Sequence, residues 1–176
     1  CTCAGATRRW PASRGSTGAV IGTLTTAPAH DRPELLGRTV PAALPPDALV
    51  AAIDPDLADT AAFCEAYAVS LGQSANCVVV AAKRGGETRY AACVALATTR
   101  VDVNGFVRRH LDARKVSFAP MDVAVAETSM EYGGITPFGL PSSWVLLVDA
   151  AVVAAPHVVV GSGIRGSKLV VPGSAL

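Results

Sequence analysis

The sequence predicts a single α+β domain, in which short helices lie among apolar strands. Its 176 residues are enough for one domain with a proper hydrophobic core. Hydrophobic residues make up 51% of the chain and charged residues only 16%, a balance that excludes an intrinsically disordered protein. Two apolar runs separated by a turn sequence give the clearest pair of strands, and helical patterns occur on both sides of it.

The domain is expected to begin at residue 29. Residues 1–28 are rich in Ala, Thr, Arg, Gly, Ser and Pro and have no sustained hydrophobic period, so we expect a disordered or loosely attached tail. Residues 29–176 form the expected folded part. A short helix is predicted at its start, over residues 31–36, and a Pro-rich connector over residues 41–47.

The first half of the expected domain contains a helix and a β-hairpin. Asp59 is a candidate N-cap for a helix that ends before Gly72. The apolar runs 77–82 and 90–97 flank the turn sequence 83–88, which contains two glycines. Two apolar runs joined by such a turn predict an antiparallel hairpin.

The second half is expected to contain two helices and several short strands. Asp102 can cap a helix in which Val103, Phe106, Val107 and Leu111 share one face. A short strand over residues 116–118 leads to a second helix, which is expected to start at Pro120 and to be closed by Gly133. Three further strands, all expected to be buried, cover residues 144–148, 157–161 and 168–171.

The net charge and the cysteine content limit which classes of function and location are expected for the chain. The net charge of +1 and the pI of about 7.8 give no global attraction to nucleic acid, so any RNA contact must come from a local basic cluster. Five cysteines, an odd number without C-x-x-C spacing, favour a reducing, cytoplasmic location. The tail lacks the apolar stretch of a signal peptide. The longest apolar run, residues 145–160, is interrupted by Asp149, Pro156 and His157, so no membrane span is expected.

Metal and serine-hydrolase chemistry find no support in the sequence. His30, His110 and His157 have no metal-ligand spacing, so no metal site is expected. The serines do not occur in a nucleophile-elbow pattern, which excludes a serine hydrolase. Cys77 and Cys93 lie in apolar strands and are interpreted as core residues.

Two glycine-rich segments stand out because each borders an apolar run. The first is Gly133-Gly134-Ile135-Thr136-Pro137-Phe138-Gly139, and the second is Gly161-Ser162-Gly163-Ile164-Arg165-Gly166. Gly133 alone is explained as the stop of a helix, and the second segment by itself is an ordinary turn. A second glycine followed by a proline describes a rigid loop whose N–H groups can be aimed at an acyl carbonyl. Arg165 beside exposed N–H groups is equally compatible with an anion site and with a plain turn.

In this order the two segments resemble the YbaK/prolyl-tRNA synthetase-associated domain family, over roughly residue 58 to the end. The resemblance implies a mixed, mainly antiparallel, barrel-like sheet surrounded by helices. It also implies hydrolysis of mischarged tRNA in trans, without a metal or organic cofactor. The implied partner is the aminoacylated 3′ end of tRNA rather than DNA or a membrane, with a synthetase or elongation factor as candidate donors of substrate. Relatives continue into a closing helix, so the chain is expected to end early at Leu176.

The resemblance also assigns roles to residues of this chain. Gly134 is expected to act in catalysis, together with Asn76 and Lys168, which would face the acyl group. Arg165 would steady the terminal ribose or phosphate. The remaining expected substrate-binding residues are Gly133, Ile135, Thr136, Pro137, Gly161, Ser162, Gly163 and Gly166. Phosphate contacts are expected from the basic residues Arg108, Arg109, Arg114 and Lys115, which would otherwise form a solvated helix face.

The chain departs from the family pattern at two charged positions. Family deacylases carry a lysine where this chain has Asn76, and Gly-Leu-Asp where it has Gly166-Ser167-Lys168. Either Lys168 replaces the missing positive charge, or the site is a relic that binds an aminoacyl end without hydrolysis; Lys83 is a third candidate for that charge. A small-ligand binding protein and an interaction module with a filled pocket remain as alternatives of other classes.

Overall fold

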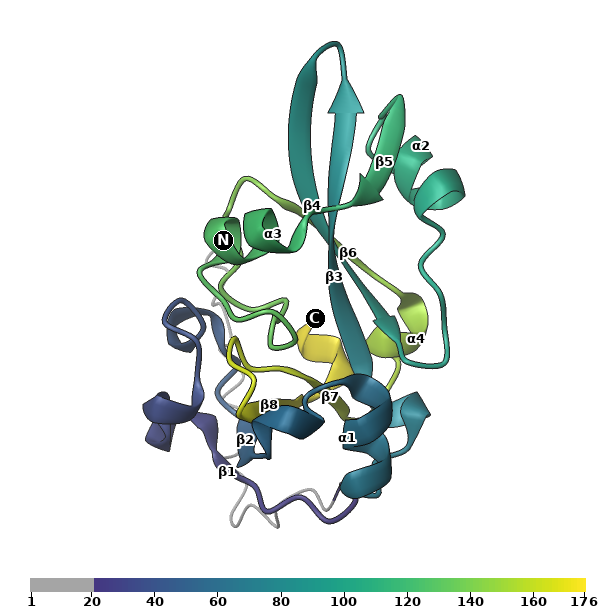
Figure 1. Ribbon diagram of the computed structural model, residues 1–176. Helices are drawn as coiled ribbons and strands as arrows, with labels where there is room; N and C mark the ends of the chain where they lie inside the picture. Colours follow the sequence, from purple (N-terminus) through teal and green to yellow (C-terminus); the bar gives the residue numbers. More distant parts are fainter. Residues whose placement is uncertain (1–20) are drawn as a thin grey trace, which may run out of the picture.

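A computed structural model of the protein describes residues 21–176, which form two four-stranded β-sheets with short helices around them (Figure 1). The first sheet is antiparallel throughout. Its strands, in spatial order, are β1 (Ala27–Pro28), β2 (Leu49–Ala52), β8 (Ser167–Val171) and β7 (Val158–Gly161).

The second sheet is mixed, because its last pair of strands is parallel. In spatial order it contains β5 (Lys115–Phe118), β3 (Ala75–Arg84), β4 (Glu87–Leu96) and β6 (Val145–Val148), and β6 runs parallel to β4. A single bridge between Ser74 and Val159 connects the two sheets. The expected α+β domain with a mainly antiparallel sheet is therefore confirmed, but the strands of residues 21–176 do not close into a barrel.

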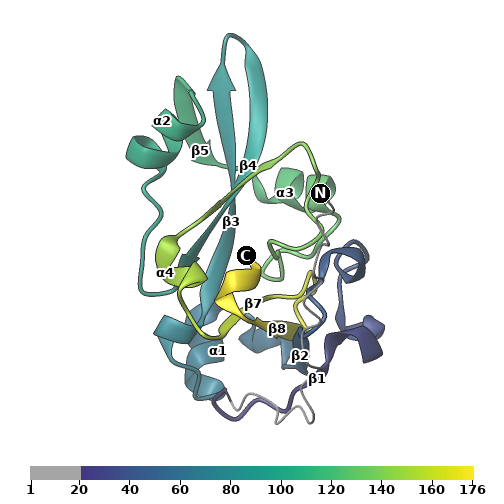
Figure 2. The same ribbon diagram turned by 180° about the vertical axis from the view of Figure 1, so that it is seen from behind.

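The β3–β4 hairpin is the longest strand pair and was predicted from the sequence. Its two-residue turn consists of Gly85 and Gly86, which have φ angles of 59° and 87°. Positive φ at both positions matches the right-handed twist of the strands and costs glycine nothing. The tip projects beyond the rest of the molecule (Figure 2), whereas the middle of both strands is buried.

The helices are short. They are α1 (Thr60–Ala66), α2 (Arg108–His110), α3 (Met121–Thr128) and α4 (Ala150–Val153). Residues 21–176 also contain six single turns of 3₁₀ helix: η1 (Ala29–Asp31), η2 (Pro33–Leu35), η3 (Pro41–Ala43), η4 (Pro55–Leu57), η5 (Leu71–Gln73) and η7 (Gly173–Ala175). The short helix expected over residues 31–36 is thus a pair of 3₁₀ turns.

Asp102 caps the next helical segment, as the sequence predicted. Its carboxylate accepts hydrogen bonds of 2.8 Å from the N–H groups of Gly105 and Phe106. The segment begins with a wide π turn, η6 (Val103–Val107), before α2. Because a π turn holds more residues than an α turn, Phe106 is rotated away from the buried face and is 56% exposed. The predicted apolar face that included Phe106 is therefore wrong at that residue.

α3 ends earlier than expected. Its C-cap is Ser129, which has a left-handed φ of 57°, rather than Gly133. The turn at Ser129 directs Met130 into the core, where only 2% of it is exposed. Gly133 then lies free of the helix, at the start of the glycine-rich loop. The strand expected over residues 144–148 is also less buried than predicted, because β6 is an edge strand.

The folded part extends at least to Ile21, eight residues before the expected boundary. Ile21 and Leu24 are buried against Phe63 of α1 and Val159 of β7. The backbone is also tied down, since the N–H of Thr23 donates to the Tyr67 carbonyl at 2.8 Å. Apolar burial of this kind overrides the loop-like composition of residues 21–28. The remainder of the expected tail, residues 1–20, lies outside the described part of the chain.

We predict that a chain starting at residue 29 is less stable than one starting at residue 21, because it loses the burial of Ile21 and Leu24. The point substitution Ile21→Ala in the full chain should lower the free energy of unfolding by about 2–5 kcal/mol, as for other buried isoleucines. Urea unfolding followed by circular dichroism measures the difference. Equal stability of all three proteins would show that this segment does not contribute to the core.

Candidate functional site

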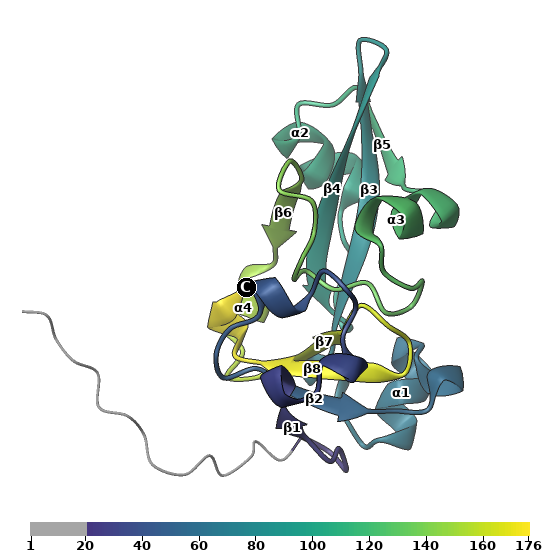
Figure 3. The same cartoon turned by 90° about the vertical axis from the view of Figure 1, so that its left-hand side faces the viewer.

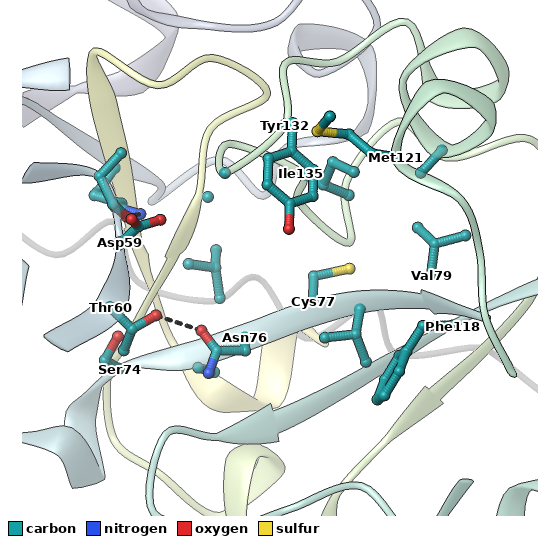
Figure 4. A pocket seen from close by; sticks show the side chains of 18 of the residues that line it. Asp59, Thr60, Ser74, Asn76, Cys77, Val79, Phe118, Met121, Tyr132 and Ile135 are labelled. Carbon is teal, nitrogen blue, oxygen red and sulfur yellow. Dashed lines mark hydrogen bonds between the residues drawn. The ribbon is translucent and has the colours of Figure 1, made fainter. Parts of the chain in front are cut away.

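A cavity of about 300 Å³ lies where the two sheets meet (Figure 4). Strand β3 forms its floor, and β7 and β8 of the other sheet form one wall. The start of α1, the start of α3 and the glycine-rich loop complete it. Its lining includes five of the residues expected from the sequence, namely Asn76, Gly133, Ile135, Gly161 and Lys168. Because the cavity is open, an interaction module with a filled pocket is not supported.

The glycine-rich loop is bound to the 161–166 turn through backbone hydrogen bonds. The Gly163 N–H donates to the Gly134 carbonyl at 2.7 Å, and the Glu131 N–H donates to the Gly163 carbonyl at 2.9 Å. The Glu131 carboxylate also accepts from the Arg165 N–H at 2.7 Å. These bonds place side by side two segments that are far apart in the sequence. We call this arrangement the loop–turn clasp.

The clasp requires glycine at its points of closest approach. A Cβ atom on Gly134 would lie within 3 Å of the Ile164 backbone, and one on Gly161 within 3 Å of the carbonyl oxygens of Gly134 and Ile135. Gly166, at the end of the same turn, is different, because its nearest neighbour would be Pro55 Cγ at 3.9 Å. Within the clasp, Gly134 and Gly161 are thus the glycines at which one segment meets the backbone of the other.

Lys168 contributes a buried amine to the cavity. It is 8% exposed, its Nζ donates to the Ala58 carbonyl at 2.9 Å, and it lies 5.3 Å from the centre of the Phe63 ring. Burial lowers the pKa of Lys168 below its ordinary value, the positive charge of Arg165 lowers it further, and the negative charge of Asp59 opposes both. A lysine amine has three donors when protonated, and the Ala58 bond uses one of them.

Asn76 lies on β3 at the same cavity, but its side chain is already engaged. The Thr60 hydroxyl donates to Asn76 Oδ1 at 2.5 Å (Figure 4). Asn76 is exposed rather than packed in the core. Its amide can donate a hydrogen bond but carries no charge. Among residues 21–176, Lys168 is the only lysine or arginine that lines the cavity.

The loop also presents backbone donors. The Gly134 N–H is satisfied by the Glu131 carbonyl at 2.9 Å. The N–H groups of Gly133 and Ile135, both cavity residues, have no acceptor within the part of the chain that the structure describes. Unpaired N–H groups at a cavity are suited to bind a carbonyl oxygen or an oxyanion.

Several expected site residues support the cavity without lining it. Arg165 donates to the carbonyls of Pro55 at 3.0 Å and Tyr132 at 3.3 Å, which ties the turn to two other segments. Ser162 is buried and shares a hydrogen bond of 2.7 Å with the Ser167 hydroxyl. The other residues in this group are Gly134, Thr136, Pro137, Gly163 and Gly166.

The expected tRNA-binding residues lie behind the sheet. The segment η6–α2 packs on the face of β3 that carries Val80 and Ala82, whereas Cys77 and Val79 of the opposite face line the cavity. Figure 3 shows α2 and α3 on opposite sides of the hairpin. The exposed basic residues Arg108, Arg109, Arg114 and Lys115 therefore do not border the cavity.

The cavity also contains residues that the sequence did not single out for a site. Asp59 was predicted as an N-cap, but its side chain makes no capping hydrogen bond and instead lines the cavity. Tyr132 and Met121 lie on the side opposite β3, and the Tyr132 hydroxyl points into the cavity (Figure 4). The position of Tyr132 directly before Gly133 was the signal that could have identified it.

The cysteines of the cavity region are poor nucleophiles. Burial raises the pKa of Cys77 to about 12 and that of Cys93 to about 11, so both thiols are protonated at neutral pH. Cys93 is a core residue as expected, whereas Cys77 is half-buried and lines the cavity.

Over residues 21–176, no group of three or more His, Cys, Asp or Glu residues is arranged to hold a metal ion. No helix in that range is both long and apolar enough to cross a membrane.

Comparisons with known proteins agree with this architecture. A family model described as "aminoacyl-tRNA editing domain" matches residues 54–176. The crystal structure of hypothetical protein APE2540 is similar, with a TM-score of 0.63 and 20% identity over 71% of this chain and 80% of that one. A putative trans-editing enzyme for prolyl-tRNA synthetase has a TM-score of 0.61 and 15% identity over 71% of this chain and 76% of its own. Among curated proteins, no sequence matches.

We predict that Gly161→Ala destabilises the protein and that Gly166→Ala, on the same turn, does not. The added methyl group at residue 161 overlaps the backbone of the loop, so the free energy of unfolding should fall by about 1–3 kcal/mol, as in other overpacked sites. The change at residue 166 should stay within about 0.5 kcal/mol. Thermal unfolding of both variants measures the effect, and equal stabilities would contradict the close contact that defines the clasp.

Proposed function

Since this chain belongs to the aminoacyl-tRNA editing domain family, we propose that it hydrolyses the ester bond between a wrong amino acid and tRNA. The observation that carries the proposal is the combination of a buried lysine amine and unpaired loop N–H groups at one cavity. The substrate is proposed to be delivered in trans, as the name of the similarly folded putative trans-editing enzyme describes for that protein. A synthetase or an elongation factor is the candidate donor, and the cytoplasm is the proposed location.

The proposed reaction needs no protein nucleophile. The oxygen of a water molecule forms a bond to the acyl carbon and gives up a proton, and the bond between the acyl carbon and the ribose oxygen breaks. The ribose oxygen takes a proton and leaves as a hydroxyl group. Charge develops on the acyl oxygen during this step, and fixed donors aimed at that oxygen lower the barrier. The N–H groups of Gly133 and Ile135 are the proposed donors, with Gly134 keeping them in place through its bond to Gly163.

Lys168 is proposed to supply the positive charge that family members obtain from the lysine at the position of Asn76. A preorganised charge is most effective where water is excluded, and Lys168 is buried at the cavity. Asn76 is then a neutral hydrogen-bond donor to the substrate, positioned by Thr60.

The tRNA itself is proposed to contact two regions. Arg165 would lie near the terminal ribose or phosphate, since it closes the clasp next to the cavity. The basic residues of α2 and β5 would neutralise phosphates farther along the acceptor stem, because they lie behind the sheet and away from the acyl group.

A second candidate is a binding protein that holds an aminoacyl end without hydrolysing it. The neutral Asn76 at the lysine position favours it, as does the Lys168 amine, which already donates to a backbone carbonyl. The two candidates differ only in turnover, so an activity measurement separates them.

We predict that Lys168→Met lowers the rate of deacylation about a hundredfold or more, because loss of one preorganised charge costs on the order of 3 kcal/mol. The rate is measured on a panel of mischarged tRNAs. Cys77→Ala is the matched control, since it changes a cavity residue whose thiol is protonated, and it should keep its activity. Circular dichroism is the check that both variants remain folded.

Three outcomes would count against this proposal. Full activity of Lys168→Met would remove the assigned role of the lysine, and loss of activity in folded Cys77→Ala would indicate a thiol nucleophile. A wild type that is silent on every mischarged tRNA, together with a folded Asn76→Lys variant that gains activity, would identify the binding protein. Asn76 is exposed, so the lysine can be accommodated there.

A further inference from the structure

The edge of β3 is uncovered where it passes the cavity. At one end Ser74 bridges to Val159 of the other sheet. At the other end the Ala119 N–H donates to the Val79 carbonyl, and β5 pairs with β3 from Val80 onward. Residues 75–79, which lie next to or between these contacts, all line the cavity. The cavity therefore occupies a gap along the edge of a strand.

The hydrogen-bonding pattern identifies which backbone groups face this gap. In an antiparallel ladder, successive residues direct their N–H and C=O groups to opposite edges of the strand. The Ser74 carbonyl accepts from the Ala97 N–H at 2.8 Å on the β4 side, and the Val79 carbonyl accepts from the Ala119 N–H at 2.9 Å on the β5 side. Cys77 is two residues from Val79, so its N–H and C=O groups face the same edge of the strand and point into the gap.

Neither backbone group of Cys77 has a partner there among residues 21–176. An unpaired backbone group away from bulk water costs about as much as a lost hydrogen bond. The gap must therefore offer a partner, either water or a ligand. A cavity of about 300 Å³ is at the small end of ligand sites. It suits a single amino acid rather than a strand from another protein.

We propose that the free edge of β3 binds the amino acid portion of the substrate as one rung of a β-ladder, with Cys77 as its partner. The α-ammonium group donates to the Cys77 carbonyl, and the acyl oxygen accepts from the Cys77 N–H. The acyl oxygen has a second lone pair, which remains available to the Ile135 N–H. This inference rests on the proposed function, because it names the contacts that the same cavity makes with an aminoacyl ester.

The arrangement selects for the α-amino group through main-chain atoms. An ester that lacks this group leaves the Cys77 carbonyl unpaired, so it should bind more weakly. The Asp59 carboxylate also lines the cavity and favours a cation there, which makes it the main rival for the α-ammonium group. Substitution of the Cys77 side chain leaves the backbone contact in place.

The test uses two non-hydrolysable probes, 3′-(L-alanylamino)-3′-deoxyadenosine and its 3′-propionylamino counterpart, which lacks the α-amine. Amide hydrogen exchange of the full chain is measured by NMR with and without each probe. In the free protein the Cys77 amide should exchange faster than those of Asn76 and Val78, which face β4. The alanyl probe should slow exchange at Cys77, and it should bind roughly tenfold or more tighter than the propionyl probe.

Equal affinity for the two probes would overturn the inference, and so would absence of binding by either. The inference also fails if the alanyl probe shifts the Gly133 and Ile135 amides but leaves Cys77 unchanged. If Asp59→Asn abolishes the preference for the α-amine, the carboxylate rather than the Cys77 carbonyl holds that group. Deacylation of mischarged tRNA without a response at Cys77 would remove this inference alone and leave the proposed function intact.

Discussion

The contact between the glycine-rich loop and the 161–166 turn determines the shape of the site. At Gly134 and Gly161 the two backbones approach so closely that no side chain fits between them. Backbone hydrogen bonds through Gly163 then fix the two segments relative to each other. Because β7 leads into this turn and β8 leaves it, the clasp also fixes the strand that carries Lys168. The wall of the cavity, its backbone donors and its amine are thus positioned by one interaction.

The chemistry of the site depends on polar groups that the fold leaves incompletely paired. Within residues 21–176 the two sheets are joined by only one bridge, so the edge of β3 next to it stays open. The same junction contains the unpaired N–H groups of the loop and a lysine whose burial lowers its pKa. Each feature costs stability, and natural proteins concentrate such costs at functional sites. This concentration is the physical basis for assigning function to the cavity.

Local patterns in the sequence predicted most of the helices and strands, but they predicted less well where an element ends and which residues are buried. The β3–β4 hairpin followed from two apolar runs and a glycine pair, and the cap at Asp102 from a single residue type. The end of α3 was missed because Ser129 adopts a left-handed conformation that its residue type does not announce. Ile21 and Leu24 were assigned to a tail because their burial depends on contacts with distant residues.

The residues of the candidate site, too, were predicted only in part from the sequence. The two glycine-rich segments could be found from their residue types and spacing, and Lys168 from the family resemblance. The cavity brings Gly133, Gly161 and Lys168 together with Asn76. The location of the basic residues could not be predicted from the sequence, since it depends on which face of β3 the α2 segment covers. The open edge of β3 is likewise invisible in the sequence, because it results from where β5 and β7 stop pairing.

A crystal structure of the protein with bound 3′-(L-alanylamino)-3′-deoxyadenosine tests the central claim most directly. We expect the alanyl group in the cavity between β3 and the loop, with its carbonyl oxygen about 3 Å from the Ile135 nitrogen and the Lys168 amine facing the same group. Binding at any other surface, or an alanyl group that contacts neither the loop nor Lys168, would contradict the assignment of this cavity as the site.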